Sequence, residues 1–286
     1  MLTNKKILIS GGCGFIGSHL VERLHAKNQI TVVDNLHSAN DTRLSGVKYV
    51  YSDIQSYLTE KPEAYDYFFH LGEYARVEQS LDEFSTVMKL NGGIETILEY
   101  VRETNCKLIY SGSSTKFYDN GNGECLSPYT FIKAQNSKLV QAYANWYDIE
   151  FAICYFYNVY GGREIGVGKY ATVISKFINA AKLKQKEVVI TSPGTQLRNF
   201  THINDTVNAL ELIAEKGYGD GYCIAGQESH SIIEIANLLK LPFKIGERNK
   251  ANRLNGVVDN AKLVGLGWAP EENLTEYLEY ALEDCS

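Results

Sequence analysis

The fold is decided by residues 6–17, which read KILISGGCGFIG. The run from Lys6 to Ser10 is short and apolar, as expected for a buried strand of a parallel sheet. The glycines that follow, Gly11, Gly14 and Gly17, have the spacing Gly-x-x-Gly-x-x-Gly. Glycine permits a tight turn and a close approach of the backbone to a ligand, and Gly17 allows close helix–strand packing. The segment therefore predicts a strand, a turn and a helix whose free N–H groups face a pyrophosphate.

An acidic residue ends the next apolar run. Asp34 follows two valines and lies 17 residues after Gly17. A carboxylate there accepts hydrogen bonds from the ribose hydroxyls of a dinucleotide and repels a 2′-phosphate, so the pattern favours NAD over NADP. The alternative is that Asp34 is a plain turn residue before Asn35. Further along, Asp53 and Ile54 either reach the adenine or belong to a surface turn.

Short apolar runs alternate with helical patterns through the first half of the chain. Further strands are expected at 29–34, 47–51, 67–71, 107–111 and 150–156, and helices at 14–27 and 128–146. This alternation predicts an α/β fold, a Rossmann-type doubly wound parallel sheet with a smaller C-terminal substrate-binding lobe. We expect residues 1–160 to form the NAD-binding domain and 161–286 mainly the second lobe, with a return to the first at about 201–226. In that half we expect helices at 171–182, 204–215, 231–239 and 274–283, and a strand at 221–225.

Composition narrows the class of protein. The 286 residues are 44% hydrophobic and 22% charged, which is ordinary for a globular chain. The net charge of −6 argues against nucleic acid as a partner. No apolar run approaches the roughly 20 residues of a membrane span, and the N-terminus does not resemble a signal peptide, so we expect no membrane association and a cytoplasmic location. The six cysteines are scattered without metal-ligand spacing, which predicts neither a metal site nor disulfides.

A second motif lies at residues 127–133, which read SPYTFIK. Ser127 suits a helix N-cap and Pro128 the first helical position. Tyr129 and Lys133 then lie four residues apart on one helical face. The ammonium would stabilise the phenolate for work as a base, and it could also hold the nicotinamide ribose. Taken alone, Tyr-x-x-x-Lys is common by chance and is usually a surface pair.

A run of hydroxyl residues follows the strand expected at 107–111. Ser113 lies in this run, and Ser114 is a reserve candidate for the same role. A hydroxyl at the carboxyl end of a parallel strand faces the ligand crevice, where it could share a substrate oxygen with Tyr129. The alternative is a polar turn at the strand exit. The three motifs together are far more specific than any one of them.

At this point the sequence resembles the extended short-chain dehydrogenase/reductases, specifically the NAD-dependent nucleotide-sugar epimerase/dehydratase family. The likeness runs nearly from end to end. It includes, beyond the motifs above, the segments His70-Leu71-Gly72, YNVYG at 157–161, GTQLRNF at 194–200 and LGWAP at 266–270.

The resemblance implies a mechanism. Tyr129 would act as the base that takes the proton of the sugar 4-hydroxyl, Ser113 would hold the same oxygen, and Lys133 would prepare the tyrosine. The resulting 4-keto sugar is then rotated and reduced again, loses water, or is epimerised next to the ketone. NAD is regenerated and behaves as a bound cofactor.

The motifs, the resemblance and one departure from it, in the segment 72–78, together predict the contact residues. Those expected to bind NAD are Gly11, Gly14, Phe15, Ile16, Gly17, Asp34, Asn35, Asp53, Ile54, Leu71, Tyr129 and Lys133. Those expected to bind the nucleotide-diphospho-sugar are Glu73, Arg76, Ser113, Ser114, Asn158, Arg198 and Arg253, with Arg248 as an alternative to Arg253. Arginine suits the diphosphate because its planar fork donates two hydrogen bonds. Glu73 and Arg76 would set sugar specificity, or else belong to an ordinary charged loop. A homodimer is expected from the family, as is a role in polysaccharide biosynthesis.

One departure from the family bears on the reaction. Familiar 4,6-dehydratases carry an acidic pair directly after the catalytic hydroxyl, where this chain has Ser114 and Thr115. Neither can expel water at neutral pH, unless Glu73, Glu78 or Glu124 supplies a carboxylate. The sequence thus predicts a nucleotide-diphospho-sugar 4-epimerase, with a 4,6-dehydratase or another 4-keto-forming enzyme as the alternative. Asp34 argues against a reductase that consumes NADPH, and the intact catalytic motifs argue against a non-catalytic NAD-binding regulator.

Overall fold

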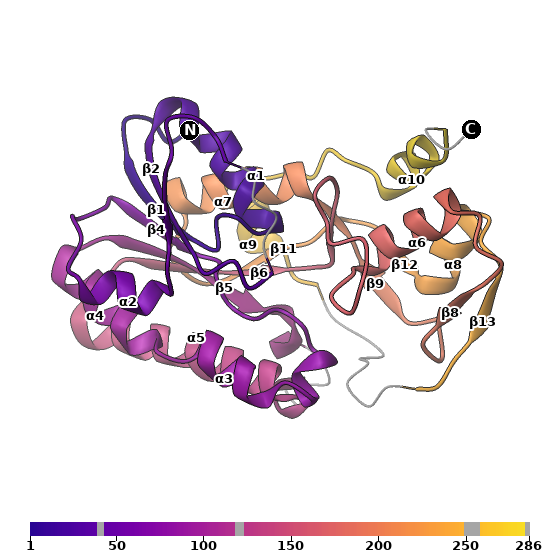
Figure 1. Ribbon diagram of the computed structural model, residues 1–286. Helices are drawn as coiled ribbons and strands as arrows, with labels where there is room; N and C mark the ends of the chain where they lie inside the picture. The colour runs from indigo at the N-terminus through magenta and orange to yellow at the C-terminus, as the bar shows by residue number, and fades with distance from the viewer. Residues whose placement is uncertain (39–42, 118–122, 249–257, 284–286) are drawn as a thin grey trace.

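The computed structural model describes residues 1–38, 43–117, 123–248 and 258–283 (Figure 1). Its centre is a seven-stranded sheet in the order β11-β6-β5-β4-β1-β2-β3, and every neighbouring pair is parallel. The predicted doubly wound Rossmann-type sheet is confirmed. The strands are β1 (Lys6–Ser10), β2 (Gln29–Asp34), β3 (Lys48–Tyr51), β4 (Tyr67–His70), β5 (Lys107–Ser113), β6 (Phe151–Phe156) and β11 (Gly219–Ile224).

Strand β1 marks the point where the winding of the sheet reverses. It pairs with β2 on one side and with β4 on the other. In an open parallel sheet, the loops that leave the carboxyl ends of two such strands diverge to opposite faces and leave a crevice. The glycine turn after β1 and the His70–Gly72 segment after β4 therefore meet at one place.

Helices cover both faces of the sheet (Figure 1). On one face lie α1 (Phe15–Leu24), α7 (Ile203–Lys216) and α9 (Ala261–Val264). On the other lie α2 (Ile54–Thr59), α3 (Phe84–Asn91), α4 (Ile94–Thr104) and α5 (Pro128–Tyr147). Each layer buries its own apolar cluster against the sheet, with Leu20 and Ile213 on the first face and Ile97 and Val140 on the second. Strands covered on both sides explain the uninterrupted apolar runs in the sequence.

A smaller lobe lies beyond the carboxyl end of the sheet (Figure 1). It contains α6 (Val173–Lys182), α8 (Ile232–Leu238) and α10 (Leu274–Glu283), with the strand pairs β8–β13 (Val188–Ile190, Phe243–Ile245) and β9–β12 (Leu197–Asn199, Ser229–Ser231). A third pair, β7–β10 (Val159–Tyr160, Thr201–His202), flanks the excursion through β8 and β9. The core of the smaller lobe includes Phe177, Ile235 and Leu278. After β10 the chain returns to the main sheet with α7 and β11.

Two boundaries differ from the sequence prediction in ways that matter for the site. The helix predicted at 14–27 is α-helical to Leu24 and ends in a 3-10 turn, His25–Lys27. The strand predicted to end at 111 continues to Ser113, because Ser111, Gly112 and Ser113 pair with β6. A further 3-10 turn, Ser114–Phe117, follows at once. Within the described ranges, no helix combines the length and apolarity needed to cross a membrane.

Candidate active site

Two adjoining cavities lie at the carboxyl edge of the sheet. They share Gly11, Gly14, Leu71, Glu73 and Arg76 in their walls. One continues along the end of β2 and the other opens between the two lobes. Together they are lined by all twelve residues predicted for NAD, namely Gly11, Gly14, Phe15, Ile16, Gly17, Asp34, Asn35, Asp53, Ile54, Leu71, Tyr129 and Lys133. The structure thus brings these residues together; their contacts with NAD stay predictions.

Two glycines of the turn, Gly11 and Gly17, leave no space for a side chain. Gly11 has a φ of +73°, and a Cβ placed on it would lie 2.6 Å from the Cα of Gly72. A Cβ on Gly17 would lie 2.1 Å from the carbonyl oxygen of Gly11. The turn opens α1 with Gly14 as its N-cap, which has no side-chain cap. A bare helix N-terminus at the floor of a cavity is suited to a pyrophosphate.

Asp34 lies at the end of β2 and forms hydrogen bonds that hold the glycine turn in place. Its Oδ2 accepts a hydrogen bond from the Cys13 N–H at 2.9 Å, and its Oδ1 accepts one from the Leu36 N–H at 2.8 Å. The residue is 8% exposed, and burial raises the pKa of its carboxyl while the two N–H bonds oppose that shift in part. Next to it, Asn35 donates to Asp53 at 2.8 Å. A rigid carboxylate in the cavity wall fits the ribose of NAD.

Helix α5 begins with a capping box, which confirms the predicted N-cap. The Ser127 hydroxyl accepts from the N–H of Thr130, whose hydroxyl in turn accepts from the Ser127 N–H, and Pro128 takes the first helical position. This start places Tyr129 and Lys133 in the wall of the cavity between the lobes. They are 8% and 3% exposed.

Ser113 ends β5 in the wall of the same cavity and is 8% exposed. Its hydroxyl lies 2.8 Å from that of Thr115, and either group can be the donor. Ser114 also lines the cavity. The predicted catalytic residues are thus gathered around one cavity, with Asn158 and Phe200 from the segments that lead into the second lobe.

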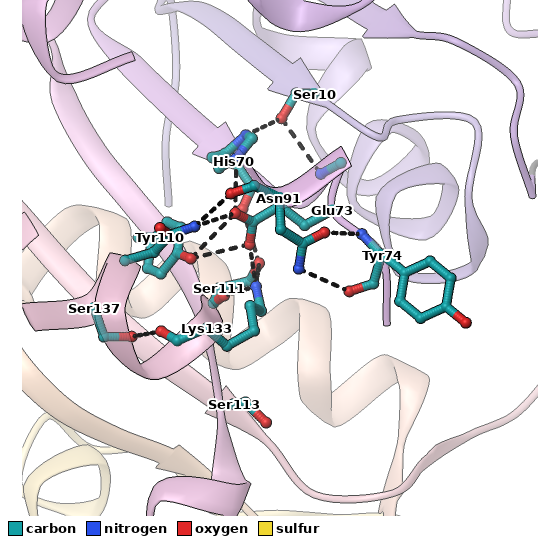
Figure 2. A network of polar contacts seen from close by, with 12 residues as sticks. Ser10, His70, Glu73, Tyr74, Asn91, Tyr110, Ser111, Ser113, Lys133 and Ser137 are labelled. Carbon is teal, nitrogen blue, oxygen red and sulfur yellow. Dashed lines mark hydrogen bonds and ion pairs between the residues drawn. The ribbon is translucent and has the colours of Figure 1, made fainter. Parts of the chain in front are cut away.

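Lys133 is held in a network of buried polar groups (Figure 2). Figure 2 shows Glu73 lying between His70, Tyr110 and Lys133. Lys133 Nζ donates to Glu73 and to the carbonyl oxygen of Ser111. Burial by itself would raise the pKa of the Glu73 carboxyl, but the Lys133 ammonium and His70 outweigh it and hold that pKa well below its ordinary value. Glu73, predicted for the sugar, therefore points toward the lysine.

Arg76, also predicted for the sugar, connects the two lobes. It lines both cavities. Its Nε and Nη2 donate to the carbonyl oxygen of Tyr170 at 3.1 and 2.8 Å, and its Nη1 donates to that of Ala75 at 3.0 Å. Burial lowers the pKa of this guanidinium. Arg76 thus fixes the loop after β4 to the segment before α6, and a sugar contact stays a prediction.

The residues predicted for the diphosphate are placed less uniformly. Asn158 lines the cavity and donates to the carbonyl oxygen of Asn199 at 2.7 Å. Arg198 is 7% exposed, lies on β9 and donates to the carbonyl oxygen of Leu197 at 2.8 Å. It is not one of the described residues that form the cavity walls. Arg253 lies outside the described residues. Both arginine contacts stay predictions.

Several residues in or beside the cavity were not identified from the sequence. Glu164 lines the cavity between the lobes and accepts from the Gly161 N–H at 2.9 Å and from the Thr172 hydroxyl, while burial raises its pKa. Tyr110 and Asn136 both donate to Glu73. No motif marks these positions, although Glu164 closely follows the YNVYG segment. In the parts of the chain that are described, no three His, Cys, Asp or Glu residues are grouped so as to hold a metal ion.

Comparison with known proteins establishes the family. The model of the NAD dependent epimerase/dehydratase family matches residues 7–225. The chain belongs to this family. The predicted membership in the extended short-chain dehydrogenase/reductases is confirmed. The predictions that the protein is an enzyme and that NAD is its cofactor are confirmed as well.

Individual members of the family are similar over almost the whole chain. The chain is 30% identical to a putative UDP-glucose 4-epimerase of Methanocaldococcus jannaschii, with 94% of this chain and 95% of that protein covered. It is 28% identical to a UDP-N-acetyl-α-D-glucosaminuronate decarboxylase of Bacillus cytotoxicus, over 81% of this chain and 78% of that one. Among solved structures, the UDP-N-acetylglucosamine 4-epimerase of Methanobrevibacter ruminantium in complex with UDP-N-acetylmuramic acid superimposes with a TM-score of 0.88 at 26% identity, covering 99% and 98% of the chains.

Proposed function

We propose that this family member is an NAD-dependent nucleotide-diphospho-sugar 4-epimerase that acts through a transient 4-keto sugar. One observation carries the proposal. Ser113, Tyr129 and Lys133 line one cavity with the glycine turn, while the two positions after Ser113 carry hydroxyls instead of carboxylates. The cavity can thus support proton transfer at one sugar oxygen next to the cofactor.

The chemistry divides between cofactor and protein. NAD, when bound, supplies the redox change at C4 of the sugar. Tyr129 takes the proton of the 4-hydroxyl and returns it after the keto sugar has turned its other face. Ser113 holds the same oxygen, and Lys133 stabilises the phenolate of Tyr129. The chain's own residues thus hold one oxygen and move one proton.

The acidic groups near the cavity favour epimerisation over dehydration. Glu73 and Glu164 are the carboxylates among its described wall residues, and in each both oxygens already accept hydrogen bonds. Glu124 pairs with Lys138 at 2.6 Å, and Glu78 is exposed. Glu73, Glu78 and Glu124 are the three carboxylates that could replace the missing acidic pair. None of them is free in the wall of this cavity.

The similar proteins support the choice of substrate class. Two of those named above are described as 4-epimerases, and all three as acting on sugars joined to UDP. We therefore propose a UDP-sugar as substrate and the second lobe, mainly 161–286, as the part that binds it. We further propose a homodimer through α5, which leaves Phe131 and Trp146 exposed at 49% and 64%.

The proposal is tested by mass spectrometry of the products formed from a panel of nucleotide sugars, UDP-sugars first, with NAD in deuterated water. The expected result is a new chromatographic isomer of unchanged mass. Loss of one water with uptake of deuterium would instead show dehydration, and loss of carbon dioxide would show decarboxylation. Tyr129→Phe protein serves as the matched control, because it should bind NAD without forming the isomer.

A further inference from the structure

The ammonium of Lys133 is surrounded by acceptors of the protein itself. Its Nζ donates to the Glu73 carboxylate, to the carbonyl oxygen of Ser111 and, at 3.4 Å, to the Ser111 hydroxyl. An ammonium has three donors, so these contacts use its whole capacity. The side chains of Lys133 and Glu73 are 4% and 3% exposed. A buried pair of this kind is stable only when the remaining polar atoms are also satisfied.

The Glu73 carboxylate meets that condition with donors from three elements. Tyr110 on β5 donates its hydroxyl at 3.0 Å, and Asn136 on α5 donates its amide at 3.2 Å. His70 at the end of β4 lies 3.6 Å away through its Nε2, while its Nδ1 is 2.6 Å from the Ser10 hydroxyl. Glu73 is therefore fixed in place independently of any ligand.

We propose that Glu73 is a positioning residue of the active site, whose carboxylate holds the Lys133 ammonium at the end of β5 and balances its charge where the nicotinamide of NAD binds. The inference rests on the proposed roles of Tyr129 and Lys133. Glu73 and both of these residues line the cavity between the lobes, together with the glycine turn.

The balance of charge has a measurable consequence that does not involve a sugar. The oxidised nicotinamide ring carries a positive charge that the reduced ring lacks. With Glu73 present, the lysine and the carboxylate form a neutral pair beside it. Without the carboxylate, an unbalanced ammonium disfavours the oxidised ring, and because Lys133 is only 3% exposed the repulsion is weakly screened. The ratio of the dissociation constants for NAD⁺ and NADH reports this difference.

The test measures both constants by titration calorimetry on the full-length protein and on Glu73→Gln, which keeps the shape and removes the charge. We expect the ratio of the NAD⁺ constant to the NADH constant to rise about tenfold, the size expected for one nearby charge. In the double variant Glu73→Gln/Lys133→Met, both charges are absent, and the ratio should return to within about twofold of the unaltered protein.

The chain offers a matched control in a second network of the same chemistry. Asp220 accepts from Lys116 and from the Tyr155 hydroxyl, each at 2.5 Å. Neither Asp220 nor Lys116 is among the described residues of the two cavity walls. Asp220→Asn removes the same charge from a lysine–carboxylate–tyrosine group, and it should leave the ratio unchanged.

Each outcome decides the proposal. Equal weakening of NAD⁺ and NADH in Glu73→Gln, or no change in the ratio, would overturn it, because a merely structural residue gives that result. If Glu73→Gln does not fold, Lys133→Met decides: its unbalanced carboxylate should favour the oxidised ring and lower the ratio, and an unchanged or higher ratio, or a second failure to fold, overturns the proposal. The measurement uses no sugar, so a failure of the proposed epimerase activity would be seen separately.

Discussion

Replacing Gly17 by alanine should damage the protein through one contact. The added Cβ would lie 2.1 Å from the Gly11 carbonyl oxygen and 2.8 Å from the Cα of Gly12. Ordinary contact begins at 3.4 Å, so the Cβ and the oxygen would have to separate by well over 1 Å. It is backbone that must move, because both contacted atoms belong to the turn. Forced overpacking costs about 1–3 kcal/mol, here about 3 because the clash is with backbone, and the better helix propensity of alanine offsets up to about 1 kcal/mol. We expect a net loss of about 2 kcal/mol in the free energy of unfolding.

The assay compares thermal melting and NAD affinity of Gly17→Ala with those of the unaltered protein. A loss of about 2 kcal/mol corresponds to a fall in Tm of about 4–8 °C. NAD should bind at least tenfold more weakly (a loss of about 1.4 kcal/mol), because the displaced turn no longer presents its N–H groups to the pyrophosphate. Gly14→Ala is the control for stability alone. Its Cβ would lie 3.3 Å from the same oxygen, so its Tm should change by less than about 2 °C. Equal melting temperatures for the two variants would refute the steric reasoning.

Three further predictions concern single residues. Tyr129→Phe should lower turnover of the nucleotide sugar by about 10³-fold while leaving Tm and NAD affinity unchanged, and near-normal turnover would remove its role as base. Asp34→Ala should weaken NAD binding at least tenfold (about 1.4 kcal/mol) in calorimetric titration, and unchanged affinity would contradict the ribose contact. The same variant should lose roughly 2 kcal/mol in stability, because two backbone N–H groups lose their acceptor. Asp205→Ala should lower the unfolding free energy in urea by about 2–3 kcal/mol, because its 1% exposed carboxylate accepts from two backbone N–H groups before α10. A loss below about 0.5 kcal/mol would show that water replaces those bonds.

The strands of the main sheet could be predicted because their local pattern and their burial agree. Lys6–Ser10 and Gln29–Asp34 are mostly apolar and are buried after their first residue, and both are found as strands with the predicted bounds. The capping box at Ser127 was also foreseeable, since all its atoms come from four consecutive residues. The small pairs β9–β12 and β8–β13 were not predicted, because three-residue strands have no period of their own and depend on partners far along the chain.

The direction of the Glu73 side chain shows where sequence reasoning ends. Glu73 follows a strand. From the local sequence alone, its side chain could equally well point into the crevice or into the interior beneath the crevice. Its orientation is set by Lys133, which is 60 residues away, and by the close approach of Gly72 to Gly11, which turns the chain inward. A motif of consecutive residues records neither fact. The candidate catalytic triad was recognisable as a set, whereas its supporting network was visible only in three dimensions.

The groups of the cavity that can donate or accept a proton limit which reaction it can catalyse. Epimerisation at C4 moves one proton between a sugar oxygen and Tyr129, whereas dehydration needs a second acid and base to break a C–H and a C–O bond. Ser114 and Thr115 do not ionise near neutral pH. Glu73 and Glu164 could serve only by giving up bonds that hold Lys133 or the backbone at Gly161. Ser113 needs no such exchange: if Thr115 donates to its oxygen, its own proton remains available for the sugar oxygen. A reaction that binds one sugar oxygen and transfers one proton needs no change in the hydrogen bonds of this cavity. A dehydration would require some of those bonds to be broken.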